Sequence, residues 1–140
     1  MASINTYLRF DGTCEEAFEF YRSILGGEFL TKSYFSEMPP EYPVADHEKT
    51  RVMHMTLPVG EHHMLFGSDT SESFGGAPVV GDNFSISYTA DTEDKARRIF
   101  DELSEGGAVV MPMDKTFWNS LFGMLTDKFG ISWMVSFELG

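Results

Sequence analysis

The sequence is poor in cysteine, in basic residues and in long apolar runs. Its single cysteine, Cys14, allows no internal disulfide, which fits a reducing compartment. Only 10 Lys and Arg stand against 22 Asp and Glu, and the resulting net charge of −12 argues against nucleic acid as a partner. No apolar run approaches the roughly 20 residues that span a bilayer, and MASINTYLRF lacks the pattern of a secretion signal. We therefore expect a cytoplasmic protein with no nucleic-acid or membrane partner.

The composition that is present is that of one globular domain. A chain of 140 residues is long enough to bury a core, and its 42% hydrophobic and 23% charged content is ordinary for a soluble globular protein.

The segment 115–137 predicts a β-hairpin. Its strands are Phe122–Thr126 and Ile131–Phe137, and the turn Asp127–Gly130 ends in a glycine that tolerates φ > 0. Along the second strand, two sets of residues alternate: Ile131, Trp133, Val135 and Phe137 on one face, and Ser132, Met134, Ser136 and Glu138 on the other. The first set should pack against a helix, with Trp133 in the core, whereas the second is suited to line a cavity.

The first half of the chain begins with a strand and a helix. Residues 4–10 alternate, with Ile4, Thr6, Leu8 and Phe10 on the buried face. Thr13 and Glu16 have the spacing of a capping box, which predicts that their side chains satisfy the first amides of a helix. Four apolar residues at helical spacing follow, Ala17, Phe20, Tyr21 and Ile24, and Gly26-Gly27 ends the helix.

Three strands complete this half. Residues 29–36 are typical of a strand, and residues 37–48 contain Pro39, Pro40 and Pro43, which predict a surface loop. Strands 50–57 and 62–68 form a second hairpin, and the Gly/Ser-rich stretch 70–82 predicts a linker.

The second half repeats this order. Residues 84–90 predict a strand, Asp91 or Thr92 a helix cap, and Gly106-Gly107 the helix end. The apolar helical stripe consists of Ala96, Ile99, Phe100 and Leu103. Placing Ala17 over Ala96 nearly superimposes the two Gly-Gly stops, and later Met64 falls on Met134. This register indicates an internal duplication of strand, helix and three strands.

Several motifs carry a resemblance to a known family. They are YLRFDG.C.EA.EFY at 7–21, GGE at 26–28, VMH at 52–54 and MLFGSD at 64–69, followed by GG.V.MP, TFW, FGML.D.FG and WM in the second half. With these motifs the chain resembles the PhnB-like branch of the glyoxalase/bleomycin-resistance/dioxygenase superfamily, also called the vicinal oxygen chelate superfamily. The resemblance implies an α+β fold of two βαβββ modules whose curled mixed sheets enclose a cavity. It further implies a single domain over 1–140, with module 1–69, linker 70–82 and module 83–140, and a homodimer.

The alternation of side chains along each strand indicates which residues line the implied cavity. Each helix must cover the more apolar face of its sheet, so the residues on the opposite face point into the cavity. The lining expected from the first module is Asn5, Tyr7, Arg9, His54, Thr56, His62, Met64 and Phe66. The second contributes Ser85, Ser87, Met124, Thr126, Ser132, Met134 and Ser136. As ligand-binding residues we single out Tyr7, Arg9, His54, Met64, Phe66, Ser85, Trp118, Met124 and Met134. This apolar pocket with scattered polar groups suits a small organic ligand.

The metal site implied by the resemblance is not matched by the residues. Metal-using relatives place His or Gln on the first strand of a module and Glu on its last strand. Here Met64 and Met134 occupy the last-strand positions, and the first-strand positions fall at Asn5 or Tyr7 and at Asn83 or Ser85. Thioethers and amides are poor ligands for a hard divalent cation. We therefore expect no metal and no cofactor.

The histidines, the cysteine and Trp118 each have a structural and a functional interpretation. His54 is the candidate acid or base, or else a satisfied polar group in a pocket wall. His62 and His63 point to opposite faces and cannot chelate together. Cys14 is read as structural, because Glu15 and Glu16 oppose a thiolate. Trp118 either overhangs the pocket as a stacking surface or anchors a loop.

Two functions follow from these observations. One is a binding module that holds a small organic metabolite without the usual metal. The other is a metal-dependent lyase, isomerase or dioxygenase of the same superfamily. Similar sequences also carry a demethylubiquinone methyltransferase label, but the chain has no Gly-rich strand-to-helix loop of the kind that holds a nucleotide-like cofactor.

Overall fold

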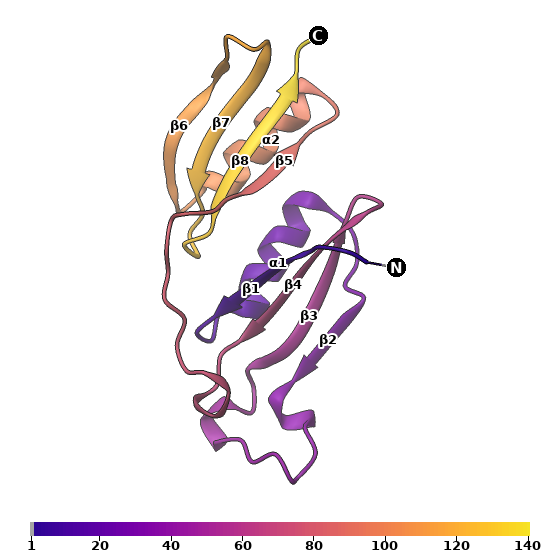
Figure 1. Cartoon of the computed structure of the whole chain (residues 1–140), viewed down its shortest axis with the longest axis vertical. Coiled ribbons are helices and arrows are strands. Elements are labelled where there is room, and N and C mark those ends of the chain that lie inside the picture. Colours follow the sequence, from indigo (N-terminus) through magenta and orange to yellow (C-terminus); the bar gives the residue numbers. More distant parts are fainter. Residues whose placement is uncertain (1) are drawn as a thin grey trace. The chain divides into compact units, whose positions relative to one another are not determined.

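The computed structural model describes residues 2–140 and shows two compact units, divided between Val79 and Val80. Each unit consists of a strand, a helix and three further strands, so that the expected α+β fold with a duplicated βαβββ order is confirmed (Figure 1). Each unit forms its own open, four-stranded sheet.

The first unit contains β1 (Thr6–Phe10), α1 (Cys14–Leu25), β2 (Thr31–Tyr34), β3 (Val52–Val59) and β4 (His63–Asp69). The sheet order is β1-β4-β3-β2, with β1 parallel to β4 and the other pairs antiparallel. Short 3₁₀ turns at Phe35–Glu37, Asp46–Glu48 and Glu72–Phe74 interrupt the loops around this sheet.

The second unit repeats the topology. It contains β5 (Ile86–Thr89), α2 (Glu93–Ser104), β6 (Ala108–Lys115), β7 (Ser120–Thr126) and β8 (Ser132–Glu138), in the order β5-β8-β7-β6. The closing hairpin of β7 and β8 lies where the sequence predicts it.

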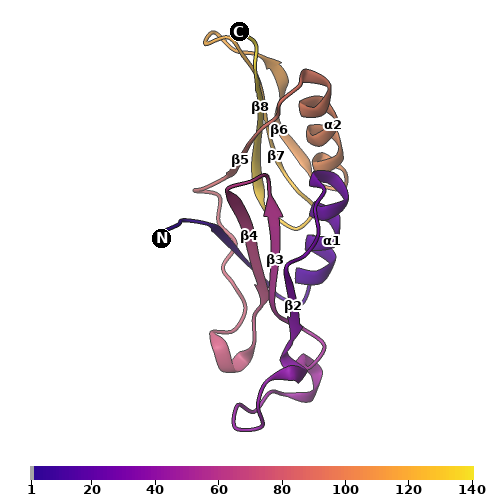
Figure 2. The same ribbon diagram turned by 90° about the vertical axis from the view of Figure 1, so that its right-hand side faces the viewer.

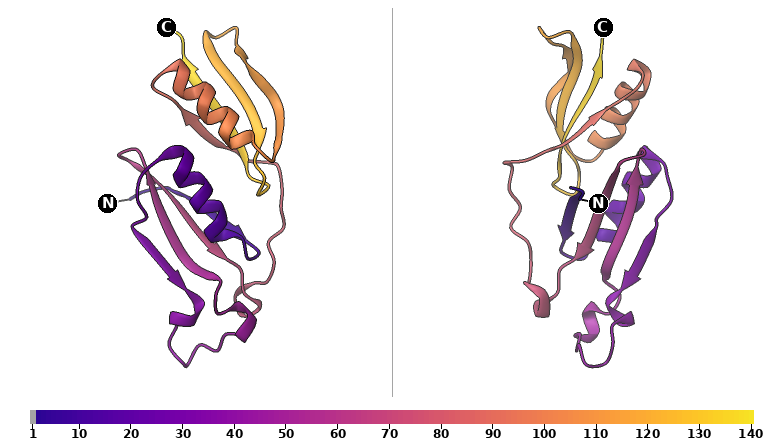
Figure 3. Two further views of the ribbon diagram at one scale, coloured as in Figure 1. Left: turned by 180° about the vertical axis from the view of Figure 1, so that it is seen from behind. Right: turned by 45° about the vertical axis from the view of Figure 1, so that its right-hand side comes forward.

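Each helix lies against one face of its own sheet, as Figures 2 and 3 show. All four residues of the predicted stripe of α2 are buried, and so are Trp133 and Val135 on the facing strand. In the first unit the fully buried Phe18, which the predicted stripe omits, packs on Gly67, where an added Cβ would lie 2.4 Å from the Phe18 ring. The other face of each sheet therefore remains for a site.

Strand starts differ from the prediction. β1 begins at Thr6, and Ile4 is 90% exposed instead of joining the buried face. Likewise Phe84 is exposed and precedes β5. β2 covers only Thr31–Tyr34 of the predicted 29–36. An apolar residue at a strand end has no neighbouring strand to pack against, so alternation alone overextends the element.

The predicted capping box of α1 is wrong. Thr13 occupies the N-cap position, but its side chain makes no capping hydrogen bond. Asp69, at the end of β4, accepts instead from the backbone N–H groups of Gly12 and Cys14, each at 2.9 Å. A carboxylate is a stronger acceptor than a hydroxyl and also suits the positive end of the helix. In α2 the predicted cap is confirmed, since Thr92 Oγ1 accepts from Lys95 N at 3.1 Å.

Neither helix is a candidate membrane span: within residues 2–140, no helix combines the length and the hydropathy required.

Candidate functional site

Aromatic side chains gather on the face of the first sheet that points away from α1. Tyr7 pairs across strands with Phe66, and Phe66 pairs with Thr56. The ring centroids of Tyr7, His54 and Phe66 lie 5.7 to 6.2 Å apart, and the His54 ring stacks on Phe66. Three of the predicted site residues are thus brought together.

A short hydroxyl chain orients His54. Thr31 Oγ1 donates to Thr56 Oγ1 at 2.8 Å, and Thr56 Oγ1 lies 3.0 Å from His54 Nε2. The Thr56 hydroxyl thus links Thr31 to the imidazole, and the His54 tautomer decides whether Thr56 Oγ1 or Nε2 is the donor in the second contact. His54 is therefore held by its Nε2 atom and stacked on an aromatic ring, as a positioned polar group would be.

A pocket of about 230 Å³ lies within this unit, and we call it the first-unit pocket. It is lined by Tyr7, Arg9, Phe35, Met38, Met53, Ser68, Asp69 and Thr70. Tyr7 and Arg9 are among the predicted site residues, whereas His54, Met64 and Phe66 do not line this pocket. Cavities for drug-sized ligands start at about 300 Å³, so this one suits a small molecule or one end of a larger one.

The other six lining residues were not predicted from the sequence, and they include the apolar Phe35, Met38 and Met53. Met53 turns toward the pocket because the register between β2 and β3 shifts: Ser33 pairs with His54, but Tyr34 pairs with Val52. Such a bulge leaves no clear trace in the sequence. Phe35 and Met38 lie in and after the turn that follows β2, and the apolar Phe35 beside a proline-rich loop was the available signal.

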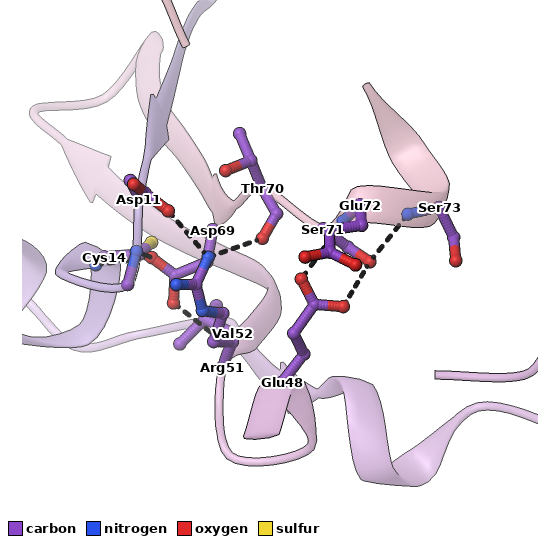
Figure 4. Close-up of polar contacts among 11 residues, drawn as sticks. Asp11, Cys14, Glu48, Arg51, Val52, Asp69, Thr70, Ser71, Glu72 and Ser73 are labelled. Atoms are coloured by element: carbon purple, nitrogen blue, oxygen red, sulfur yellow. Dashed lines mark hydrogen bonds and ion pairs between the residues drawn. The ribbon is translucent and has the colours of Figure 1, made fainter. Parts of the chain in front are cut away.

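One wall of the pocket is held by the polar network in Figure 4. Arg51 donates to Asp11 and to the backbone oxygen of Thr70, each at 2.9 Å. Glu48 accepts from the Ser71 hydroxyl at 2.9 Å and from Glu72 N at 3.0 Å. These bonds fix the segment after β4, from which Thr70 lines the pocket. Glu48 belongs to the predicted surface loop but is buried, and the hydrogen bond from Glu72 N holds the pKa of its carboxyl below the usual value.

Thr70 adds a further polar feature to this wall. Its hydroxyl oxygen is buried and has no hydrogen-bond partner among the residues that the structure describes. Unpaired buried groups are rare, and they are typical of places that an ordered water or a ligand completes.

Cys14 has no reactive character. Its side chain is fully buried, and burial, followed by the charges of Asp69 and Glu15, strongly raises the pKa of the thiol. A thiol that stays protonated is a poor nucleophile.

The open face of the second sheet carries a row of methionines. Cross-strand pairing places Ser87 beside Met134, Met134 beside Met124, and Met124 beside Met111. Trp118 is 54% exposed and contacts Phe122, which lies on β7, at a centroid distance of 6.0 Å. The structure thus places Met124 and Met134 together, while Ser85 lies just before β5.

Asp127 does more than form the predicted turn. It is buried, and its carboxylate accepts from the indole Nε1 of Trp133 at 2.9 Å and from the backbone of Phe129 and Ile131. This carboxylate anchors the closing hairpin from inside the core.

The residues at the family's metal positions do not fit a hard divalent ion. The amide oxygen of Asn5 already accepts from Met64 N at 3.1 Å, and Met64 and Met134 offer only thioethers. Within residues 2–140, no three His, Cys, Asp or Glu side chains gather in a way that would hold a metal. His62 is exposed beside Glu61.

Comparisons with known proteins agree with this fold. Residues 3–135 match the Glyoxalase/Bleomycin resistance protein/Dioxygenase superfamily. The chain is 30% identical to Protein YjdN of Escherichia coli K12, over 95% of this chain and 93% of that protein. It is also similar to the crystal structure of PA1353 from Pseudomonas aeruginosa, with a TM-score of 0.86, 40% identity, and 99% and 98% of the two chains covered.

A third relative comes from Bacillus cereus and is described as a putative 3-demethylubiquinone-9 3-methyltransferase, PhnB protein. It has a TM-score of 0.76 and 26% identity, with 97% of this chain and 99% of that chain covered. The chain therefore belongs to the Glyoxalase/Bleomycin resistance protein/Dioxygenase superfamily, and PhnB-like proteins are among its structural neighbours.

Proposed function

We propose that this protein binds a small organic metabolite and does so without the usual metal of its superfamily. The first-unit pocket carries the proposal. Its wall combines aromatic rings and thioethers, from Phe35, Met38 and Met53, with the polar groups of Arg9 and Ser68. Apolar walls with a few placed polar groups are the ordinary make-up of a small-molecule site. From Tyr7, which lines the pocket, the rings of Phe66 and His54 extend the aromatic surface beyond it.

The chemistry of the donors supports binding without metal. A divalent ion of the kind that activates oxygen or polarises a carbonyl needs imidazoles and carboxylates converging on one point. The family positions of this chain offer amide, hydroxyl, phenol and thioether groups instead.

A methyltransferase activity, as in the description of the B. cereus relative, is not supported by the β1–α1 junction. A nucleotide-like cofactor is held by free backbone amides where a strand enters a helix. In this chain the amides of Gly12 and Cys14 already donate to the Asp69 carboxylate.

Metal analysis decides between the binding protein and a metal-dependent enzyme. We would purify the protein without added metal and measure its metal content by native mass spectrometry and elemental analysis. We expect no stoichiometric divalent ion. One tightly held ion per chain would contradict the proposal and favour a lyase, isomerase or dioxygenase.

The pocket itself is tested with a variant that fills it. We would follow indole and 3-phenylpropionamide, two neutral apolar probes, by ligand-observed NMR. Met53→Trp should abolish saturation transfer to both probes, because the larger ring occupies the cavity. Leu30→Trp, at an exposed position outside the pocket, is the control and should bind as the wild type does. Binding that survives in folded Met53→Trp would place the ligand elsewhere.

A further inference from the structure

The cations of the first unit are paired with acids, with one exception. Arg22 pairs with Glu19, Lys32 with Glu15, Lys49 with Asp46 and Arg51 with Asp11. Arg9 is the remaining Lys or Arg before Val80, and it makes no ion pair or hydrogen bond within residues 2–140. In a chain with a net charge of −12, an unpaired guanidinium is unusual, since acids are in excess.

This unpaired cation lies at the first-unit pocket. Arg9 points away from α1 and lines the pocket together with Tyr7 and Ser68, and Ser68 is its cross-strand partner on β4. A Cβ added at Gly75 would lie 3.3 Å from Nη2 of Arg9, so the guanidinium reaches the segment after β4. Gly75 has φ +102, a backbone conformation that favours glycine. Because glycine has no side chain, the guanidinium of Arg9 has room beside it.

The neighbouring carboxylate does not neutralise Arg9. Asp69 also lines the pocket, but its two oxygens accept three backbone N–H groups, from Gly12, Cys14 and Val52. The nearby Arg51 is likewise engaged, with Asp11 and with the Thr70 carbonyl. Arg9 is therefore the cation of this pocket that is available to a ligand.

We propose that the first-unit pocket selects a monoanionic carboxylate with an apolar body, and that the carboxylate pairs with Arg9. This rests on the proposed binding function and specifies its ligand class. One guanidinium matches one carboxylate with two parallel hydrogen bonds. The apolar body lies against Phe35, Met38 and Met53. A dianion such as a phosphonate is disfavoured, because no second free cation lines the described pocket and the chain is strongly acidic.

A matched series of ligands tests the proposal. We would titrate three ligands into the full chain and follow binding by calorimetry and ligand-observed NMR. They are 3-phenylpropionate, its uncharged amide analogue 3-phenylpropionamide, and phenylphosphonate. The carboxylate should bind about tenfold more tightly than the amide, a modest ratio because Arg9 is partly solvated. Phenylphosphonate should bind more weakly than the carboxylate.

Two protein variants test whether the guanidinium of Arg9 causes the preference for the carboxylate. Arg9→Gln should bind the carboxylate and the amide equally, with the amide affinity unchanged. Arg97→Gln makes the same change on the exposed face of α2 and should keep the tenfold preference. A preference for the carboxylate that persists in Arg9→Gln would overturn the proposal, as would one lost equally in both variants.

The two proposals fail in different ways. Equal binding of carboxylate and amide by the wild type would overturn the carboxylate preference and leave the binding pocket standing. Tighter binding of phenylphosphonate than of 3-phenylpropionate would overturn the monoanion as the proposed ligand class and favour a dianion. Absence of binding for both the carboxylate and the amide would overturn the pocket as a ligand site, and the carboxylate proposal with it.

Discussion

The carboxylate of Asp69 joins three segments of the first unit, since it accepts from Gly12 and Cys14 at the start of α1 and from Val52 at the start of β3. Asp69 is 4% exposed, so no water can take the place of its carboxylate as the acceptor for these amides. Hydrogen bonds to a buried charge are stronger than neutral ones, and the loss of the acceptor leaves several donors unsatisfied. Asp69 also lines the first-unit pocket, so a change at this residue affects both the stability of the unit and the pocket wall.

Asp69→Ala should therefore destabilise the fold by about 3 kcal/mol or more, because three backbone donors lose their acceptor. Asp69→Asn should cost less, since its remaining oxygen still accepts while its amide nitrogen cannot. Urea denaturation followed by circular dichroism measures both variants. A midpoint for Asp69→Ala equal to that of the wild type would contradict the assigned role.

Thr13→Ala tests the same junction from the other side. The sequence predicts a loss of about 1 kcal/mol for removing a capping hydroxyl. The structure lowers this expectation to a few tenths of a kcal/mol, because the Thr13 hydroxyl makes no capping bond and Asp69 supplies the acceptor. A clear loss in the denaturation midpoint would show that the hydroxyl does cap the helix.

Glu48 gives the first unit a pH-dependent contact. Its pKa is lowered in the folded state, mainly by the hydrogen bond from Glu72 N and also by the Ser71 hydroxyl. The stabilisation is therefore complete above the unfolded value of about 4.3 and is lost as the pH falls through the lower folded pKa. Glu48→Gln should be less stable than the wild type at neutral pH, and the difference should shrink below about pH 4. Thermal melts at pH 7, 5 and 3 check this, and a gap that does not depend on pH would contradict it.

At the scale of elements, the hairpin of β7 and β8 separates a dry face from an open one. Trp133 is 1% exposed and donates to buried Asp127, whereas Met134 is half-buried and pairs with Met124 and Ser87 on the opposite face. Neighbouring residues of one strand therefore meet very different surroundings.

Exchanging each residue for glutamate measures this difference. Trp133→Glu loses the indole packing and places a second carboxylate near Asp127, which should cost several kcal/mol and leave the protein largely insoluble. Met134→Glu should stay folded, because its carboxylate can remain hydrated on the open face. Expression, solubility and thermal melts compare the two. Equal stability of the two variants, or the reverse order, would mean that the strand faces the other way.

Met134→Glu also places a carboxylate at the position where metal-using relatives carry a ligand. We expect at most a weak gain in divalent-metal affinity, because the other donors at the family positions are amides, hydroxyls and thioethers. Titration with Mn²⁺ or Zn²⁺ would show it.

Periodicity predicts regular elements well and irregular ones poorly. The stripe of α2, the faces of β8 and the duplicated order follow from alternation and helical spacing, because burial of one face is a local pattern. Met53 reaches the pocket only through a bulge, and Asp69 and Glu48 act on partners 17 to 57 residues away. Contacts of this kind depend on tertiary geometry. Of the residues that line the first-unit pocket, Tyr7 and Arg9 were therefore predicted from the sequence, while Met53 and Phe35 were not.

At the scale of the whole molecule, apolar side chains remain exposed on an edge strand. β6 lies at one edge of its sheet, and Val109, Val110 and Met111 on it are exposed. The exposed Phe117, 97% accessible, follows this strand. An edge strand with apolar side chains presents both unpaired backbone groups and surface that favours association.

We propose that two copies of the chain associate to cover this surface. The 13 Phe and 9 Met in 140 residues, which leave apolar surface to be covered, support this proposal. Sedimentation at micromolar concentration should give the mass of a dimer. Val110→Lys, which places a charge on the edge strand, should shift the population toward monomer. Lys95→Gln, on the solvent-facing side of α2, serves as a control that should not. The net charge of −12 repels a second copy, so raising the salt concentration should strengthen the dimer by screening that repulsion. A wild-type protein that remains monomeric at both low and high salt would refute the association, and a dimer unaffected by Val110→Lys would move the contact away from β6.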